Sequence, residues 1–463
     1  MSTLLNYLGS FIIGAAISAL PARARAQGNR LDQYIQQAFA GNEGLHAQQF
    51  SLDKSLAALD EARSLFLPNV SLQGSYTKAA GGRAVDIPVG DLLNSVYQTL
   101  NKLTASQAFP HLQNQSFLLN PDNFYDVHVH TTLPLVNEEL WYNRKMHQEA
   151  ISASQAAVNV YKRELVRNIK VAYFQCYQAL MAIRIYSDAL ALVRENIRVN
   201  QSFYANGVRN GTSLLRAQTE QQQDSALLIR AQGDYRNAEA YFDFLLNRPE
   251  TDSVIMDTAA FVDVAGGAAM AAGPAAGGIE GREELSQWRS QQRLSSLELN
   301  MEQSYLVPKV STFLDLGSQG VGTVNGQTAY YFFGLSLEWD LFAGGQHHYR
   351  ARQADYDIKS AQAGYDQTEQ VLEMQLTQAR NDYASAVAVY RSARTQATLA
   401  EKYYHDQLKA YKEGQLLYIE LLDAQRQLTD ARLQVAQAVA GVQIAAAGLE
   451  RDQATYPLQP TKS

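Results

Sequence analysis

Residues 207–218 read GVRNGTSLLRAQ, and residues 414–425 read GQLLYIELLDAQ. The two stretches share five identities at an offset of 207 residues. Upstream of these stretches the repeat continues as a series of mostly apolar residues spaced by seven, called the heptad seam below. The seam runs from Ile169 to Tyr204 in the first half and from Leu376 to Tyr411 in the second. Mostly apolar first and fourth positions over five heptads predict a coiled coil. The chain is therefore predicted to contain two related halves, each with a long coiled-coil helix.

Helix-breaking residues are nearly absent from both seams. Residues 138–206 contain neither proline nor glycine, and residues 346–413 contain only Gly364. Since proline and glycine are the strongest helix breakers, each stretch is predicted to be one helix, roughly 100 Å long at about 1.5 Å of rise per residue. Partner helices are expected at 212–247 and 416–455.

Segments with alternating apolar and polar residues precede each long helix, at 68–134 and 308–341. Alternation with a period of two is typical of a strand with one apolar and one polar face. Each segment is predicted to form two strands, separated by loops of 46 residues at 78–123 and of 10 residues at 320–329. In the last strand the lipid-facing side is predicted to contain Phe333, Leu335, Leu337 and Trp339, opposite Ser336 and Glu338.

The remaining segments separate two repeats, residues 27–256 and 282–455. Amphipathic helices are predicted at 28–67 and 280–306, ahead of the first strand of each half. Residues 257–281 are rich in alanine and glycine and are predicted to be a flexible connector.

The amino terminus has the features of an export signal. Residues 4–20 are mostly apolar, and Ala24-Arg25-Ala26 fits a small-x-small cleavage site, so residues 1–26 are expected to be a signal peptide. No later run of 18 or more apolar residues occurs, so no membrane-spanning helix is expected in the mature chain. At the other end, residues 456–463 are expected to form a short disordered tail.

The strands permit two interpretations. A soluble sheet with one polar face is the simpler one. The export signal favours the other, in which the strands belong to an outer-membrane β-barrel. Four strands are too few to close a barrel around a pore, because even small closed barrels need about eight. Cyclic association of three chains with four strands each would supply 12.

The composition excludes several classes of function. A formal charge of −7 and a pI near 5.7, without a block of basic residues, argue against a nucleic-acid partner. The single cysteine, Cys176, excludes an intramolecular disulfide and a cysteine-rich zinc site, and its heptad position predicts a small buried residue rather than a nucleophile. Because no P-loop, HExxH, GxSxG or dinucleotide-binding motif occurs, we do not expect an enzyme.

Two pairs of side chains have both a functional and an ordinary interpretation. His128 and His130 share one strand face, but no third metal ligand is evident at a suitable spacing. We therefore expect polar, pore-facing side chains there and no metal or cofactor. Trp141 and Trp339 lie at the strand-to-helix ends of the two halves, either in an interfacial aromatic girdle or in ordinary packing.

Taken together, these residues resemble the TolC-type outer-membrane efflux channel family (the outer membrane factors). The likeness covers nearly all of the mature chain. It rests on the two-fold repeat, on Leu-Pro-Asn-Val-Ser at 67–71 with its counterpart Val-Pro-Lys-Val-Ser at 307–311, on Trp-Asp-Leu-Phe-Ala-Gly-Gly at 339–345, and on the 414–424 tip. The resemblance implies an α+β membrane protein, in which a trimeric 12-stranded transmembrane β-barrel stands on a long α-helical coiled-coil tunnel.

The same resemblance implies a location and partners. The protein would lie in the outer membrane of a Gram-negative bacterium and extend into the periplasm. It would passively export small toxic molecules or polypeptides, together with a periplasmic adaptor (membrane fusion) protein and an inner-membrane pump such as an RND or ABC transporter. A structural coiled-coil surface fibre or adhesin without transport activity is the alternative, although strands in both halves argue against it. A periplasmic enzyme would need a convergent polar cluster that the sequence does not show.

The resemblance also assigns residues at the periplasmic end. Gly207 and Gly414 mark two helix tips, which would carry adaptor contacts. The leucines near the tips are Leu214, Leu215, Leu421 and Leu422. Glu420 and Asp423 match an acidic constriction, and because they are three residues apart they lie on one helix face. Arg216, the first-half counterpart of Asp423, is expected to pair with these acids on an adjacent helix and hold the end closed.

Overall fold

The computed structural model describes residues 30–120, 122–208, 210–249, 252–256, 277–323 and 328–458. The expected signal peptide and residues 257–276 of the expected connector lie outside the described residues. The chain divides into two units. The first lies within Met1–Ser55, Ala150–Gln292 and Lys359–Ser463, and the second within Leu56–Glu149 and Arg293–Ile358.

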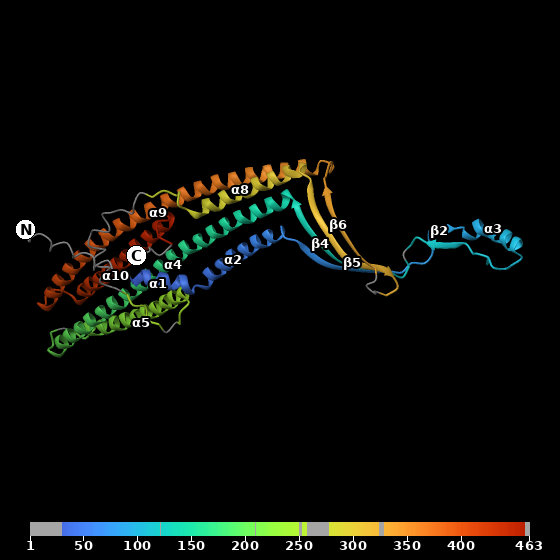
Figure 1. The fold of residues 1–463 in the computed structure, drawn as a ribbon. Coiled ribbons are helices and arrows are strands. Elements are labelled where there is room, and N and C mark those ends of the chain that lie inside the picture. The colour runs from blue at the N-terminus through green and yellow to red at the C-terminus, as the bar shows by residue number, and fades with distance from the viewer. Residues whose placement is uncertain are drawn as a thin grey trace, which may run out of the picture. The chain divides into compact units, whose positions relative to one another are not determined.

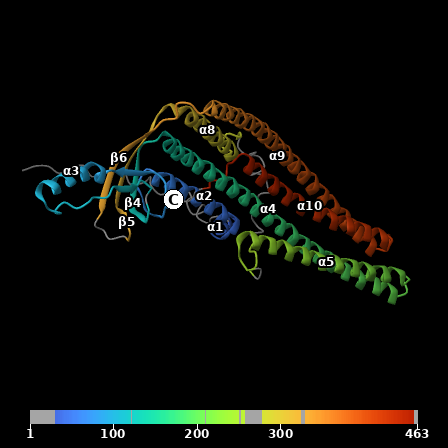
Figure 2. The same ribbon diagram turned by 90° about the vertical axis from the view of Figure 1, so that its right-hand side faces the viewer.

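Long helices form most of the first unit. Helix α4 spans Glu138–Ala205 and α9 spans Gln346–Lys412, where the sequence predicts 138–206 and 346–413. Their partners are α5, Thr212–Leu246, and α10, Tyr418–Asp452. The chain reverses at the end of each long helix, so that α4 lies beside α5 and α9 lies beside α10 (Figures 1 and 2). The first turns of α4 and α9 belong to the second unit.

The helical segments ahead of the strands differ from the expectation. Within the segment expected to be helical at 28–67, the described residues form two helices, α1 (Arg30–Gly41) and α2 (Glu43–Ser64). The break has a capping residue, because Asn42 Oδ1 accepts a hydrogen bond from the Leu45 backbone N–H at 3.0 Å. In the second half, α8 spans Glu283–Gln303 and a 3₁₀ turn, η1, spans Ser304–Leu306.

The core of the first unit follows the heptad seam. Ile169 and Cys176 of α4 are fully buried and pack with apolar residues of α1 and α5. Tyr34 of α1 and Phe242 of α5 meet edge to face, with ring centroids 5.1 Å apart. Burial raises the pKa of the Cys176 thiol to about 12, with smaller contributions from Glu239 and Asp243. Cys176 is thus a buried, protonated thiol, as its seam position predicts.

A four-stranded antiparallel sheet lies in the second unit. Its strands are β1 (Asn69–Thr77), β4 (Phe124–Val136), β5 (Lys309–Val321) and β6 (Ala329–Glu338), in the order β1-β4-β5-β6. The pairing of β4 with β5 joins the hairpin of the first half to that of the second. In this register Leu72, Val129, Leu316 and Tyr331 form one row across all four strands. Residues from both halves therefore meet on each face of one sheet.

The 46-residue loop between β1 and β4 has secondary structure of its own. It contains a two-stranded sheet of β2 (Ala84–Ile87) and β3 (Gln115–Leu118), with helix α3 (Val89–Thr104) between them. The sequence carried a signal for α3, since Pro88 precedes it and leucines and valines recur at helical spacing.

Two further findings concern the chain as a whole. In the described residues, no helix is both long enough and apolar enough to cross a membrane. The expected disordered tail does not begin at 456, because Arg163 Nη1 donates a hydrogen bond to the Tyr456 carbonyl at 3.0 Å and the Tyr456 ring packs on the core. Residues 459–463 of that tail lie outside the described residues.

Candidate functional site

Each long helix ends at a glycine in the left-handed region. Gly207 has φ +68° and Gly414 has φ +78°. The Val208 N–H donates to Phe203 O at 2.9 Å and the Gln415 N–H donates to Ala410 O at 3.0 Å, which is the bond pattern that ends a helix after a left-handed residue. A side chain at either glycine would meet no atom within 4 Å, so the backbone conformation, not space, requires glycine there.

The four tip leucines fall into two groups. Leu215 is 66% exposed and Leu214 is half-buried, so both present apolar surface. Leu421 and Leu422 are 0% and 2% exposed and pack with Tyr404, Tyr411 and Tyr418 inside the unit. The expectation that the last two contact an adaptor is therefore corrected, because their side chains support the tip from within.

The predicted acidic residues, Glu420 and Asp423, are both exposed. Glu420 Oε2 accepts a hydrogen bond from the Leu417 N–H at 3.1 Å, which caps the first turn of α10. Asp423 Oδ2 accepts one from Gln427 Nε2 at 2.6 Å. Among the described residues, no ion pair joins Arg216 to Glu420 or Asp423.

A different set of polar side chains ties the four helices together near the tips. Arg426 Nε of α10 donates to Glu220 Oε1 of α5 at 2.8 Å. Two further bonds reach α4, from Tyr411 OH to Asn200 Oδ1 at 2.6 Å, and from Asn196 Nδ2 to Gln425 Oε1 at 2.7 Å. Buried polar groups cost free energy unless they are paired, so these bonds specify how the helices align.

Asp224 lies one turn beyond Glu220 and is also buried. Burial, followed by the neighbouring charge of Glu220, raises the pKa of the Asp224 carboxyl to about 6, while Arg426 acts in the opposite direction. Sequence reasoning missed both acids. Their spacing in the sequence does indicate burial. Ala217, Glu220 and Asp224 recur at intervals of three and four residues, so they share one helix face, at positions that face a partner helix in a coiled coil.

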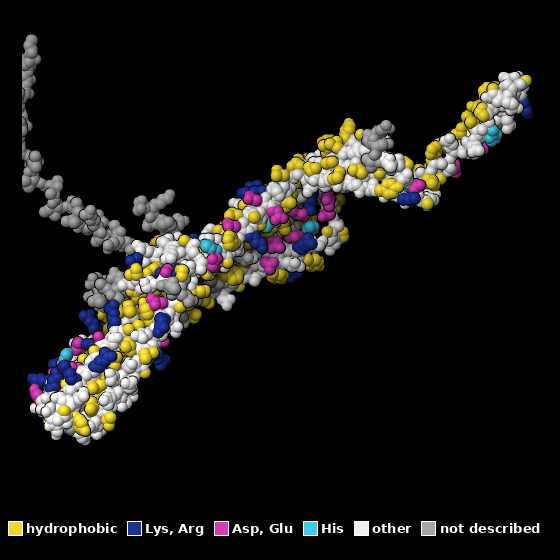
Figure 3. Space-filling model, turned by 90° about the horizontal axis from the view of Figure 1, so that it is seen from below, with side chains coloured by type: hydrophobic (Ala, Val, Ile, Leu, Met, Phe, Trp, Pro, Cys, Tyr) yellow, Lys and Arg dark blue, Asp and Glu magenta, His cyan; other side chains and the backbone are white. Residues whose placement is uncertain are grey.

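One face of the sheet is apolar and exposed. The row formed by Leu72, Val129, Leu316 and Tyr331 is between 37% and 75% exposed. The predicted Phe333, Leu335 and Leu337 lie on the same face of β6 and are each about two-thirds exposed. Figure 3 shows hydrophobic side chains gathered along the strands. A surface of this kind marks contact with lipid or with a partner.

Trp339 and Trp141 stand outside the sheet. Trp339 follows the last residue of β6, so strand alternation does not fix the direction of its ring. Trp141 lies in the first turn of α4, where Lys145 Nζ is 3.4 Å from the ring centroid and Tyr142 packs edge to face. Both rings are partly exposed.

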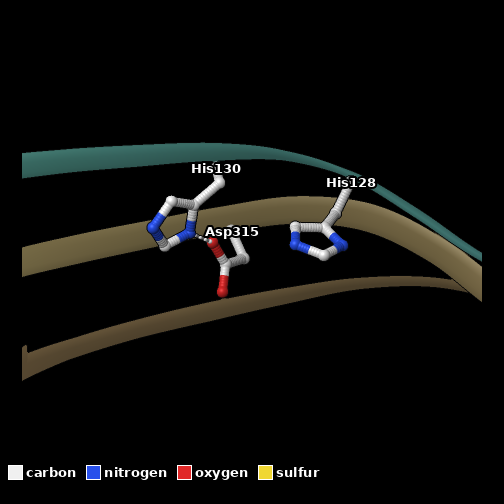
Figure 4. Close-up of side chains that lie close together, drawn as sticks. All are labelled: His128, His130 and Asp315. Carbon is white, nitrogen blue, oxygen red and sulfur yellow. Dashed lines mark hydrogen bonds and ion pairs between the residues drawn. The ribbon is translucent and has the colours of Figure 1, made fainter. Parts of the chain in front are cut away.

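The opposite face of the sheet is polar, and it brings His128 and His130 to Asp315 of β5 (Figure 4). One possible ligand atom from each side chain lies within 4.8 Å of the other two. The expectation that a third metal ligand is lacking is therefore corrected. Asp315 lies 185 residues from His130 in sequence, and only the pairing of β4 with β5 brings the two together.

Comparison with protein families gives one match. The model of the outer membrane efflux protein family covers residues 34–248 and 279–451. A sequence comparison with curated proteins gives no match.

Solved structures share the fold. The outer-membrane channel OprN has a TM-score of 0.69 at 17% identity, with 92% of this chain and 89% of that chain covered. VceC of Vibrio cholerae also has 0.69, at 13% identity and coverage of 92% and 96%. The open state of the MtrE outer membrane channel of Neisseria gonorrhoeae has 0.67, at 15% identity and coverage of 92% and 88%. At these identities the likeness concerns the fold.

Proposed function

The chain belongs to the outer membrane efflux protein family, and on that premise we propose how its own residues build the tunnel and its two ends. The protein is an outer-membrane tunnel component of a tripartite efflux system and spans the periplasm. Members of the family are transport channels and not enzymes, and they form trimers that work with adaptor proteins and inner-membrane pumps.

At the membrane end, three copies of the four-stranded sheet close into a 12-stranded transmembrane β-barrel. The two outer strands of the sheet support this closure into a barrel. In the described residues, β1 pairs only with β4 and β6 pairs only with β5, so each outer edge has unpaired backbone groups. Such groups cannot remain unpaired in lipid. In a ring of three, β1 of one copy pairs with β6 of the next.

The apolar face of the sheet meets the lipid, and the polar face lines the lumen. Phe333, Leu335 and Leu337 then lie against acyl chains, and Trp339 lies at the interface with the headgroups. Ser336 and Glu338 line the lumen. Small toxic molecules or polypeptides pass along this polar surface.

At the periplasmic end, the exposed tips contact the adaptor. Leu214 and Leu215 supply apolar surface on the first tip, and Leu417, which is also exposed, supplies it on the second. Glu420 and Asp423 of three copies form an acidic ring at the narrowest point. The adaptor links this end to an inner-membrane pump of the RND or ABC type.

The observation that carries the proposal is the two-faced sheet, with an exposed apolar row on one side and histidine and acidic side chains on the other. The decisive experiment is single-channel recording of the purified chain in a planar bilayer. Discrete conductance steps are expected, and detergent buffer alone should give none. A surface fibre or adhesin with this fold would leave the bilayer electrically silent, and that result would overturn the proposal.

A further inference from the structure

The polar face of the sheet concentrates ligand-type side chains at one place. His130 lies directly opposite Asp315, and their side chains are joined by a hydrogen bond between Nδ1 and Oδ1. His128 lies two residues along β4 and therefore on the same face. Its partner on β5 is Gly317, where a Cβ would stand 2.4 Å from the Cβ of His128. Any side chain at 317 would therefore clash with His128 and the backbone of β4.

The carboxylate of Asp126 already orients the His128 ring. Asp126 Oδ1 lies 3.2 Å from His128 Nδ1 and accepts a hydrogen bond from Tyr330 OH at 2.7 Å. A carboxylate bonded to one ring nitrogen fixes the tautomer and leaves the other nitrogen as a ligand, which is the usual arrangement behind a metal-binding histidine. Figure 4 shows one nitrogen of the His128 ring turned towards Asp315 and the other turned away. Since Nδ1 is engaged by Asp126, Nε2 is the nitrogen free for a ligand.

We propose that His128, His130 and Asp315 bind one divalent transition-metal ion that bridges β4 and β5. The donor set selects the class of ion. Two imidazole nitrogens and one carboxylate oxygen suit Zn²⁺, Co²⁺, Ni²⁺ or Cu²⁺, whereas Mg²⁺ and Ca²⁺ take oxygen ligands. Three protein ligands leave at least one position open for water or an exchangeable group.

Binding needs only small movements. Zinc ligands lie about 2.0–2.2 Å from the ion, so ligand atoms now within 4.8 Å of one another have to rearrange only slightly: His128 moves towards the ion, and His130 and Asp315, now hydrogen-bonded, move apart around it. The hydrogen bond between His130 and Asp315 is exchanged for two bonds to the ion, one from each side chain. All three side chains are half-buried, so an ion can enter from the polar face.

This site goes beyond the proposed function and does not depend on it, since its ligands come from one chain. The first test is titration of the purified full chain in detergent, after removal of metals with a chelator. Co²⁺, followed by its visible absorption, and Zn²⁺, followed by calorimetry, should each bind at one ion per chain.

Variants locate the site. His130→Gln and Asp315→Asn should weaken binding by about 100-fold or more, and Asp126→Asn by about 10-fold, because it keeps the ligands but loses their orientation. The matched control is His405→Gln, an exposed histidine of α9, which should bind as the unchanged chain does. Absence of stoichiometric binding, or equal binding by all variants, would overturn the proposal.

A chemical protection experiment on the unchanged chain tests the site independently of whether the variants fold. Diethyl pyrocarbonate modifies accessible imidazoles, and mass spectrometry reads each site. Zn²⁺ should protect His128 and His130 but not His405. Equal modification of all three histidines with and without Zn²⁺ would overturn the proposal, whatever the variants show.

Discussion

At the scale of single residues, Asp224 gives the protein a pH-dependent stability. The pKa of its carboxyl is about 6, raised from 3.8 by burial and by Glu220. Because the pKa is higher in the folded protein than in the unfolded chain, protonation favours folding. This contribution is complete below about pH 4 and is lost as the pH rises through about 6.

The substitution Asp224→Asn should remove this dependence. Within the window from about pH 4 to 6, the free energy of unfolding of the unchanged chain should fall by up to about 1.4 kcal/mol per pH unit from this group, and the variant should lack that slope. Denaturant unfolding followed by circular dichroism at several pH values measures it. Asp406→Asn, at an exposed position of α9, is the control and should keep the slope. Parallel profiles for unchanged chain and Asp224→Asn would show that Asp224 is ionised throughout.

A second prediction at this scale concerns the exposed acids of the tip. Replacing Glu420 by Gln and Asp423 by Asn together should lower cation selectivity and weaken block by multivalent cations, because carboxylates act on ions within a screening length of about 8 Å at physiological salt. Glutamine keeps an oxygen that accepts from the Leu417 N–H, so the cap of α10 survives. The reversal potential in a salt gradient measures selectivity, with Asp406→Asn as control. If the double variant keeps the selectivity of the unchanged chain, the constriction lies elsewhere.

At the scale of elements, the two faces of β6 predict opposite outcomes for one substitution. Arginine at Leu335 would place a charge in the apolar face and should cost roughly 2–4 kcal/mol near the middle of the bilayer. Arginine at the neighbouring Ser336 lies on the polar face and should mainly change conductance. Yield of the assembled channel and single-channel recording separate the two effects. Equal assembly defects would mean that the faces are assigned in reverse or that neither meets lipid.

How far the sequence predicts these elements depends on the range of the contacts that decide them. The ends of α4 and α9 follow from local chemistry, since Gly207 and Gly414 stop helices that contain almost no breakers. Asp315 could not be predicted as a third ligand, because its position beside His130 depends on the pairing of two strands about 185 residues apart in sequence. The burial of Leu421 and Leu422 likewise depends on which helix packs against α10. The spacing of apolar residues in the sequence does not identify that helix.

At the scale of the whole molecule, the sheet edges decide the assembly. Within the described residues β1 and β6 each have one neighbour, so one chain presents two rows of unpaired N–H and C=O groups. Each such group costs several kcal/mol in a hydrocarbon environment, and only closure into a ring removes both rows.

The protein extracted from membranes in mild detergent should therefore be a trimer that persists on dilution. Native mass spectrometry measures this directly. The expected mass of the trimer is at most about three times 51.3 kDa, the mass of the full sequence, and it is lower if a leader is removed. Lysine crosslinking before extraction should give dimers and trimers and no larger products, because a closed ring has no free edge left for a fourth copy. Cys176 does not disturb such a measurement, since its buried thiol with a raised pKa does not form disulfides between copies. A folded monomer that stays inserted in the membrane would show that the edges are satisfied in another way, and the 12-stranded ring would then be wrong.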